Sequence, residues 1–400
     1  MESWDASTAR WDVMTMTMRL AALAAAFLLG ACAVPAGRSS LGEGDITPGM
    51  LLEASPLASA ATLPEVGRED ILYVSPEMHE FLKGYVTPDQ NEYFRLQQLL
   101  YAVMGEGKFQ LVYDDRTRTA QETFRDQRGN CLSFTNMFVA MARYAGLDAY
   151  YQEVEIPAQW SLSGQAFLLS QHVNVFMDLS HDETRIVDFN ILDFNTSYER
   201  RVISDERARA HYFNNIGVEH MLEGGTALAL ANFRASVLED QNFAPAWINL
   251  GILHRREGLP AYAETAYLQA LQADRYNLVA MSNLANLYEQ EGLVERAAEY
   301  RARVVSHRNK NPYYRFHVAS EAFINGDYDA AISHVKYAIR KRKDEPRFYS
   351  LLSLSYLMGG DKASAERWMK KAEAVAAQSA DPAADQQKYH HKLEWLMSQG

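Results

Sequence analysis

Cys131 occupies a position at which a thiol can act as a nucleophile. It follows Arg-Gly-Asn and opens a stretch whose apolar residues recur at helical spacing as far as Gly146. In the first turn of a helix, unpaired backbone N–H groups and the positive end of the helix dipole stabilise a thiolate. The same N–H groups can stabilise an oxyanion that develops during acyl transfer. The sequence therefore predicts a nucleophilic thiol, although a lone cysteine can also be a small buried hydrophobe.

A base and an orienting acid for this thiol are predicted in a hairpin downstream. Residues 172–176 alternate in polarity as a strand does, and residues 185–189 form a second extended segment after a polar turn. A turn centred on Ser180 pairs His172 directly with Asp188. Directly paired side chains share one face of the sheet, about 5 Å apart. That arrangement suits an imidazole whose second ring nitrogen is held by a carboxylate.

The pairing of His172 with Asp188 depends on the register of this hairpin. A shift of the pairing by one residue would place the two side chains on opposite faces of the sheet. A turn centred on Asp182 would keep them on one face but separate them by roughly 13 Å along the strand. Asp178 and Asp193 are the alternative orienting acids, and Asp188 has a structural alternative as a strand terminus or an ion-pair partner.

The motifs around these residues follow one another in a definite order, with spacings of 41 and 16 residues between the cysteine, the histidine and the aspartate. They comprise residues 129–135, 145–149, 172–175 and 187–189. Over roughly residues 90–200, this order resembles the core of the transglutaminase-like, papain-related superfamily. The resemblance implies an α+β domain in which Cys131 is the nucleophile, His172 the general base and acid, and Asp188 the residue that orients His172. The family's usual aromatic residue two positions after the histidine is replaced here by Asn174.

Three further residues are weak candidates for the substrate cleft. Gln127 is a candidate oxyanion donor, although Gln121 also precedes the cysteine and neither spacing decides between them. Trp160 precedes the histidine strand and is a candidate cleft wall or a cover for the core. Asn174 is the third, because it departs from the family pattern. The sequence contains no cluster with metal-ligand spacing and no glycine-rich phosphate loop, so we expect neither a metal nor a cofactor.

The C-terminal half is predicted to be an array of helix pairs with a period of 34 residues. Small residues recur at equivalent positions, and glycines follow the first helix of each pair: Gly217, Gly251, Ala285 and Ser320; Gly224, Gly258, Gly292 and Gly326. Small residues let the paired helices pack closely, and aromatic residues fill the gaps between pairs. The pattern resembles tetratricopeptide repeats, with about five units over residues 205–380 and a capping helix over residues 381–400.

The resemblance to tetratricopeptide repeats implies a concave groove that binds a protein or peptide. Asn249, Asn283 and Asn286 fall on first helices, where groove-lining polar residues are expected. Support of the N-terminal domain and self-association are the alternatives. The chain carries 51 acidic against 39 basic residues, which argues against nucleic acid as the main partner.

The N-terminal residues resemble a bacterial lipoprotein signal. Leu20 to Leu29 are apolar or alanine throughout, too few to span a bilayer but typical of a signal-peptide core. Leu-Gly-Ala-Cys follows, and we expect acylation of Cys32 after a signal over residues 1–32 whose start lies at Met1 or within Met14–Met18. A non-Asp residue after the cysteine favours the outer membrane, facing the periplasm. Ordinary secretory cleavage and a short anchor helix are the alternatives.

Two functions are compatible with this organisation. Residues 33–70 are expected to be a flexible tether, residues 71–204 the transglutaminase-like domain, and Cys131 a free thiol because acylated Cys32 cannot pair with it. The first function is a membrane-anchored, cysteine-dependent acyl-transfer enzyme, an amide or peptide hydrolase or a transamidase, whose repeats bind a protein or peptide. The alternative is a non-catalytic scaffold lipoprotein that acts through protein–protein interaction.

Overall fold

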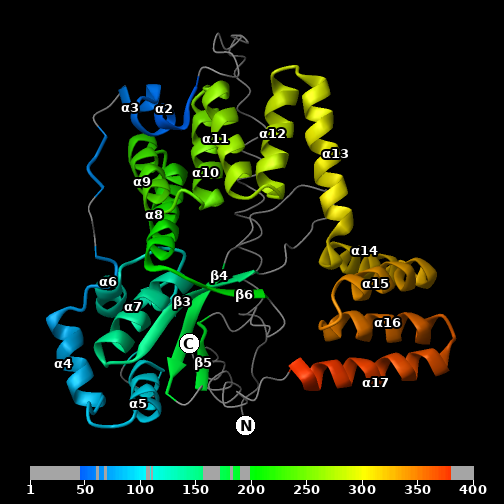
Figure 1. The fold of residues 1–400 in the computed structure, drawn as a ribbon, viewed down its shortest axis with the longest axis horizontal. Helices are drawn as coiled ribbons and strands as arrows, with labels where there is room; N and C mark the ends of the chain where they lie inside the picture. The colour runs from blue at the N-terminus through cyan, green and yellow to red at the C-terminus, as the bar shows by residue number, and fades with distance from the viewer. Residues whose placement is uncertain are drawn as a thin grey trace, which may run out of the picture. The chain divides into compact units, whose positions relative to one another are not determined.

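A computed structural model describes residues 46–59, 63–66, 70–104, 109, 111–155, 172–180, 183–189 and 199–379 (Figure 1). These residues all fall within one compact unit, residues 41–400. None of the described helices is long and apolar enough to cross a membrane. The expected signal over residues 1–32 and the expected capping helix over residues 381–400 lie outside the described residues.

The N-terminal domain consists of helices around a small antiparallel sheet. Its elements are α4 (Pro76–Tyr85), α5 (Glu92–Met104), β1 (Val112–Tyr113), α6 (Ala120–Asp126), β2 (Arg128–Gly129), α7 (Cys131–Tyr144), β3 (Asp148–Glu155), β4 (His172–Leu179), β5 (Glu183–Val187) and β6 (Glu199–Ile203). The four longer strands form a sheet in the order β5-β4-β3-β6, whereas β1 and β2 form a short parallel pair. This is the α+β architecture expected from the sequence.

Helix α7 is the central element of this domain. Every residue from Leu132 to Ala142 is buried, because the helix contacts α5, α6, β3 and β4. Asn130 caps the helix by accepting a hydrogen bond from the backbone N–H of Ser133 at 3.0 Å. Gly129 is required at this approach, since a Cβ built there would lie 2.4 Å from the Cβ of Ser133. The expected helix start at Cys131 is therefore confirmed. The Asn130 cap and the close approach of Gly129 to Ser133 fix the backbone at this point.

The register of the β4–β5 hairpin differs from the expected one. Val175 pairs with Val187, so the turn is centred one residue later than Ser180. When the centre of the turn moves by one residue, each residue pairs with a partner two positions farther along the other strand. A shift of two positions keeps every side chain on the same face of the sheet. His172 and Asp188 therefore share a face of the sheet as expected, but they are diagonal neighbours and not a direct pair.

The C-terminal region consists of ten described helices in consecutive antiparallel pairs. They are α8 (Asp205–Leu222), α9 (Thr226–Glu239), α10 (Ala244–Arg256), α11 (Pro260–Ala273), α12 (Leu278–Gln290), α13 (Val294–Lys310), α14 (Pro312–Ile324), α15 (Tyr328–Lys341), α16 (Pro346–Met358) and α17 (Lys362–Ser379). A Cβ built at Gly217 would lie 2.6 Å from the ring of Phe233, and one at Gly251 would lie 2.5 Å from the ring of Tyr267. The recurring small residues thus let paired helices approach closely, as the period predicted.

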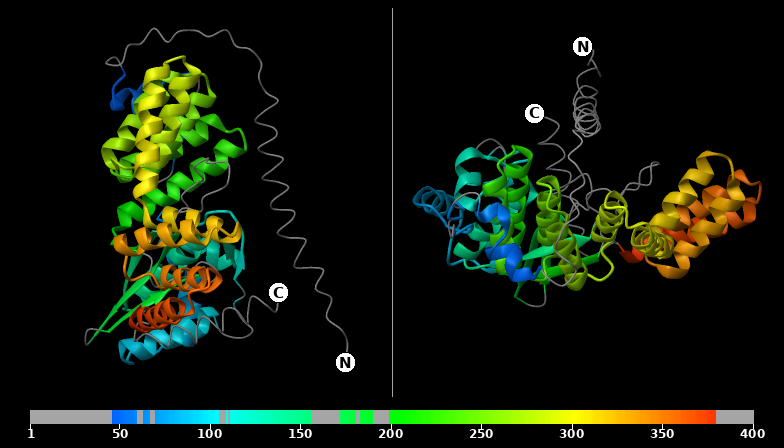
Figure 2. Two further views of the ribbon diagram at one scale, coloured as in Figure 1. Left: turned by 90° about the vertical axis from the view of Figure 1, so that its right-hand side faces the viewer. Right: turned by 90° about the horizontal axis from the view of Figure 1, so that it is seen from above.

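Part of the expected tether packs against the repeats. Helices α2 (Pro48–Glu53) and α3 (Pro56–Ser59) contact α11 and α9, respectively (Figures 1 and 2). Leu51 is fully buried, and Oγ of Ser55 lies 2.8 Å from Nε2 of His254. Within the expected tether, residues 48–59 are therefore largely helical and packed against the repeats. The low average hydrophobicity of that stretch hides individual apolar residues that find a surface on distant helices.

A buried ionic network joins the sheet to the first repeat helix. Glu153 of β3 accepts hydrogen bonds from His211 at 2.8 Å and Arg201 at 2.6 Å, and Arg207 lies 3.1 Å away. Burial raises the pKa of Glu153, but the hydrogen bonds and charges of these partners outweigh burial and lower the pKa to about 2. Since α8 supplies both His211 and Arg207, the network ties the two regions together.

Candidate active site

The thiol lies at the N-terminal end of helix α7. Cys131 is the first residue of this helix, is partly exposed, and is a free cysteine. Asn130 before it donates a hydrogen bond to Oγ1 of Thr117 at 2.7 Å while it caps the helix. The helix start is thereby fixed to a neighbouring loop. The first turn of a helix has backbone N–H groups without intrahelical partners, and such groups can stabilise an oxyanion during acyl transfer.

His172 and Asp188 form a buried hydrogen-bonded pair. Nε2 of His172 lies 2.7 Å from Oδ1 of Asp188, and their side chains are only 6% and 8% exposed. A carboxylate at this position fixes the orientation of the imidazole ring and favours its protonated form. Asp178, one of the alternative orienting acids, is exposed farther along β4, and Asp193 lies outside the described residues.

Asn174 is part of this buried pair and not of a substrate cleft. Its side chain is fully buried, and its Nδ2 donates a hydrogen bond to Oδ2 of Asp188 at 2.7 Å. The two oxygens of Asp188 are therefore held by two different residues of β4. A fully buried amide cannot line an open cleft, so the structure contradicts the expected cleft position of Asn174 and assigns it to the support of Asp188.

The imidazole of His172 also faces Cys131. Burial lowers the pKa of His172, but hydrogen bonds and Coulombic attraction from Asp188 and Cys131 outweigh burial and raise the pKa from 6.5 to about 10. Because Asp188 occupies Nε2, Nδ1 is the nitrogen available to the sulfur. The structure thus brings the three residues together: the imidazole is hydrogen-bonded to Asp188 and lies near enough to Cys131 for the thiol to contribute to its raised pKa.

Tyr113 is a residue near the thiol that the sequence did not single out. It pairs with Gly129 in the short β1–β2 ladder, and Gly129 lies two residues before Cys131. Its side chain is 54% exposed. Partial burial, together with the nearby Cys131, Asp115 and Asp114, raises the pKa of Tyr113 to about 12. A phenol that stays protonated beside the sulfur is a hydrogen-bond donor at this site. The parallel pairing of two-residue strands has no sequence signature, which explains why it was missed.

Two further site residues were expected from the sequence, Gln127 and Trp160. Gln127 ends α6 in the left-handed conformation, with φ of 52°, and its carbonyl accepts a hydrogen bond from the N–H of Val112 at 2.9 Å. This backbone role connects α6 to β2. Trp160 lies outside the described residues. Within the part of the chain that the structure describes, no three His, Cys, Asp or Glu side chains form a group that could hold a metal ion.

Residues 80–175 match the model of the transglutaminase-like superfamily. The match contains Cys131 and His172 and ends before Asp188. The chain therefore contains a transglutaminase-like α/β domain, followed by a helical region that resembles a tetratricopeptide-repeat solenoid. No curated protein sequence matches the chain.

Several solved structures are similar to the helical region. The crystal structure of MamA protein is 19% identical, covers 43% of this chain and 94% of that chain, and has a TM-score of 0.24. YrrB, a TPR protein with an unusual peptide-binding site, is 17% identical over 43% of this chain and 86% of that chain, with a TM-score of 0.23. The APC/C hetero-tetramer Cut9-Hcn1 is 20% identical, covers 42% of this chain and 33% of that chain, and has a TM-score of 0.24. Superpositions at these scores carry no functional inference for this chain.

Proposed function

We propose that this protein is a thiol-dependent acyl-transfer enzyme in which Cys131 forms a thioester from a carboxamide or peptide bond. The observation that carries the proposal is the buried hydrogen bond between His172 and Asp188, with the imidazole beside Cys131 at the start of α7. A protonated imidazole beside the sulfur at the start of α7 supports a thiolate–imidazolium pair, the reactive form of such a nucleophile.

The proposed reaction begins with attack of the sulfur on the carbonyl carbon. A carbon–sulfur bond forms, and the oxyanion is stabilised by backbone N–H groups in the first turn of α7 and by the phenol of Tyr113. The carbon–nitrogen bond then breaks, and the proton of His172 passes to the leaving amine. In the second half, neutral His172 takes a proton from water or from an acceptor amine. That nucleophile displaces the sulfur, which restores the thiolate and the imidazolium.

Asp188 and Asn174 act on this reaction through His172. The carboxylate holds Nε2 so that Nδ1 faces the sulfur, and it stabilises the imidazolium that donates the proton. Asn174 prevents rotation of the carboxylate by holding the second oxygen. Hydrolysis and transamidation share these steps and differ only in the nucleophile that resolves the thioester.

The repeats and the N-terminus complete the proposal. The helical region binds a protein or peptide that the N-terminal domain acts on. Acylation of Cys32 anchors the protein in a bacterial cell envelope, at the outer membrane facing the periplasm. The support for this anchor is the sequence around Cys32. Fractionation of cells that produce the Cys32→Ser variant tests it, since loss of the protein from the membrane fraction is expected and unchanged membrane association contradicts it.

Acylation by an activated ester tests the proposed chemistry. The full chain with Cys32→Ser has Cys131 as its one thiol, so the acetylation by p-nitrophenyl acetate that is lost in Cys131→Ser, followed by mass spectrometry, reports on this residue. We expect rapid acetylation at pH 7 and subsequent loss of the acetyl group, with both steps slowed at least a hundredfold in His172→Ala. Acetylation at the same slow rate in both proteins would identify the domain as a non-catalytic module.

A further inference from the structure

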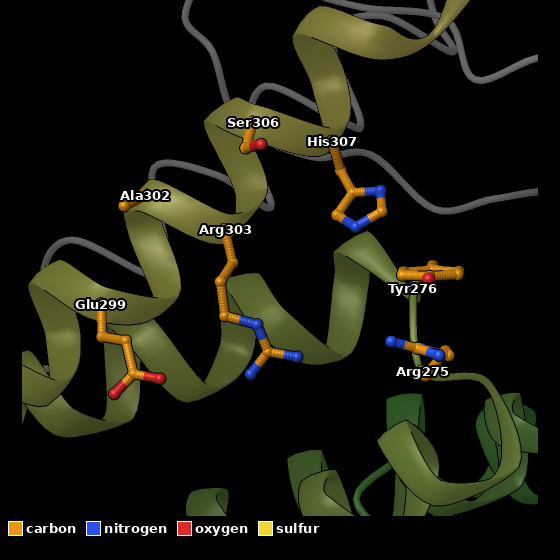
Figure 3. Close-up of a pocket in the computed structure, with 7 residues that line it drawn as sticks. All are labelled: Arg275, Tyr276, Glu299, Ala302, Arg303, Ser306 and His307. Atoms are coloured by element: carbon orange, nitrogen blue, oxygen red, sulfur yellow. The ribbon is translucent and has the colours of Figure 1, made fainter.

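We propose that the cleft between the α11–α12 loop and helix α13 binds an extended peptide through one of its carboxylate groups. The cleft has a volume of about 470 Å³ (Figure 3). It is lined by Arg275, Tyr276, Glu299, Ala302, Arg303, Ser306 and His307. The inference rests on these repeat residues alone and is independent of the chemistry proposed at Cys131.

One wall of the cleft is a stack of three side chains. The guanidinium of Arg275 lies over the ring of Tyr276, 4.5 Å from its centroid, and the ring of His307 lies 4.5 Å from the same centroid. Figure 3 shows the tyrosine ring between the other two groups. Tyr276 is 50% exposed, yet both neighbours constrain its ring. The backbone N–H of Tyr276 donates a hydrogen bond to Oδ1 of Asp274 at 3.1 Å. The wall is therefore ordered before any ligand binds, which lowers the entropic cost of binding.

A second cation faces the same space from helix α13. The side chain of Arg303 extends from the helix toward the cleft (Figure 3), and its guanidinium lies 4.7 Å from the centroid of the Tyr300 ring. Among the described residues, neither Arg303 nor Arg275 has a carboxylate within 4.0 Å, whereas Arg301 on the same helix is paired with Glu289. Two arginines that keep their N–H groups available can hold a carboxylate or a phosphate with paired hydrogen bonds.

The acidic residue in the lining distinguishes between these two anions. Two arginines and one glutamate give the cleft a formal charge of +1 with His307 neutral, in a chain whose net charge is −12. Glu299 repels a phosphate, which carries about two negative charges and few donors. A peptide offers one carboxylate to the arginines and backbone N–H groups to Glu299 and Ser306. The mixed lining therefore favours a peptide.

None of Asn249, Asn283 and Asn286, the residues expected to line a repeat groove, lines this cleft. Asn249 of α10 donates a hydrogen bond to Asn214 at 2.8 Å and is thus engaged with its neighbouring helix. The cleft is formed instead by a second helix of a pair and by the loop that precedes the first helix of that repeat. Its ligand would reach the array at the edge where α11 and α12 are connected.

Binding of short peptides to the full chain tests this site. The probe is the fluorescein-labelled, C-terminally amidated pentapeptide Ala-Glu-Tyr-Glu-Ala, and its counterpart carries Gln in place of both Glu residues. A third peptide has the Gln sequence with a free C-terminus and distinguishes a side-chain carboxylate from a chain end. We expect saturable binding of a carboxylate-bearing peptide, at least tenfold tighter than binding of the amidated Gln peptide, and weaker binding at higher salt.

Variants on one helix provide the matched control. Arg303→Gln and Arg275→Gln should each weaken peptide binding at least tenfold, whereas Arg301→Gln, which removes the same charge from the same helix outside the cleft, should change it less than twofold. Glu299→Ala should lower the affinity for the peptide. It should also let inorganic phosphate compete more strongly for the cleft. Equal affinities for all three peptides, equal effects of the three arginine variants, or displacement of the peptide by equimolar phosphate would each overturn the proposal. Circular dichroism of each variant checks that the repeats remain folded.

Discussion

Nδ2 of Asn174 lies 2.7 Å from Oδ2 of Asp188, the carboxylate oxygen that His172 does not contact. Because Oδ1 of Asp188 lies 2.7 Å from Nε2 of His172, the carboxylate is held between two residues of the same strand. A carboxylate fixed at both oxygens cannot rotate away from the imidazole. The orientation of His172, and with it the proton that faces Cys131, depends on this clamp.

Removal of the clamp should reduce the reactivity of the site without unfolding the domain. Asn174→Ala removes a hydrogen bond to a buried carboxylate, a contribution of about 1.5–3 kcal/mol, so acetylation of Cys131 should slow about tenfold or more. The dependence of the rate on pH should also change, since Asp188 then supports the imidazolium less well. Stopped-flow acylation between pH 5 and pH 10 measures both effects. A merely structural role would lower the melting temperature but leave the pH profile of the folded protein unchanged.

Tyr113 should contribute to the rate but little to stability. Its phenol lies near Cys131, is half-exposed, and keeps its proton because its pKa is raised to about 12. Tyr113→Phe removes the donor and should slow acylation about tenfold, while the melting temperature stays within about 2 °C of the wild type. Tyr73→Phe, at another exposed tyrosine, is the matched control. Equal rates for the two variants would remove Tyr113 from the reaction.

The buried imidazole should make stability depend on alkaline pH. The folded-state pKa of His172 is about 10, above the value of about 6.5 in an unfolded chain. Its stabilising contribution is therefore complete below pH 6.5 and is lost as the pH rises through 10. The difference in urea midpoint between the wild type and His172→Gln should narrow between pH 6 and pH 10. A difference that stays constant over this range would show that the imidazole is not held in its protonated form.

The Glu153 network should make the chain sensitive to loss of a single carboxylate. The pKa of Glu153 is lowered to about 2, so its contribution is present above about pH 4.5 and is lost as the pH falls through 2. Glu153→Gln removes the buried carboxylate that His211, Arg201 and Arg207 share and should cost about 3 kcal/mol at pH 7, although Arg207 keeps Asp240 at 2.9 Å. Glu239→Gln, which breaks a partly exposed pair with Arg209, should cost less than about 1 kcal/mol. Chemical denaturation compares the two, and similar losses would contradict a buried network.

The helices and their spacing could be predicted because their signals are local or periodic. The apolar spacing after Arg-Gly-Asn identified the start of α7, and the 34-residue period identified the repeat pairs. The packing of Gly251 against Tyr267 follows from the same period, since small residues recur where paired helices cross. In these cases residues close in sequence determine the structure, so pattern and geometry agree.

The features that could not be predicted depend on the details of pairing and packing and not on local patterns. The turn after Ser180 determines the hairpin register, and a change of one residue in its centre converted a direct pair into a diagonal one. No sequence pattern around Asn174 shows whether its side chain lines a cleft or holds the carboxylate of Asp188. Leu51 is buried by helices about two hundred positions away, which no local average of hydrophobicity can show.

Alkylation of Cys131 as a function of pH tests the central claim most directly. The full chain with Cys32→Ser is treated with iodoacetamide between pH 5 and pH 9, and the modified fraction is followed by intact mass in the wild type and in His172→Ala. A free cysteine has a pKa of about 8.5 and reacts slowly below it. We expect rapid alkylation near pH 6 that disappears when His172 is removed. Slow alkylation that rises only near pH 8.5 in both proteins would contradict the thiolate–imidazolium pair and the enzyme with it.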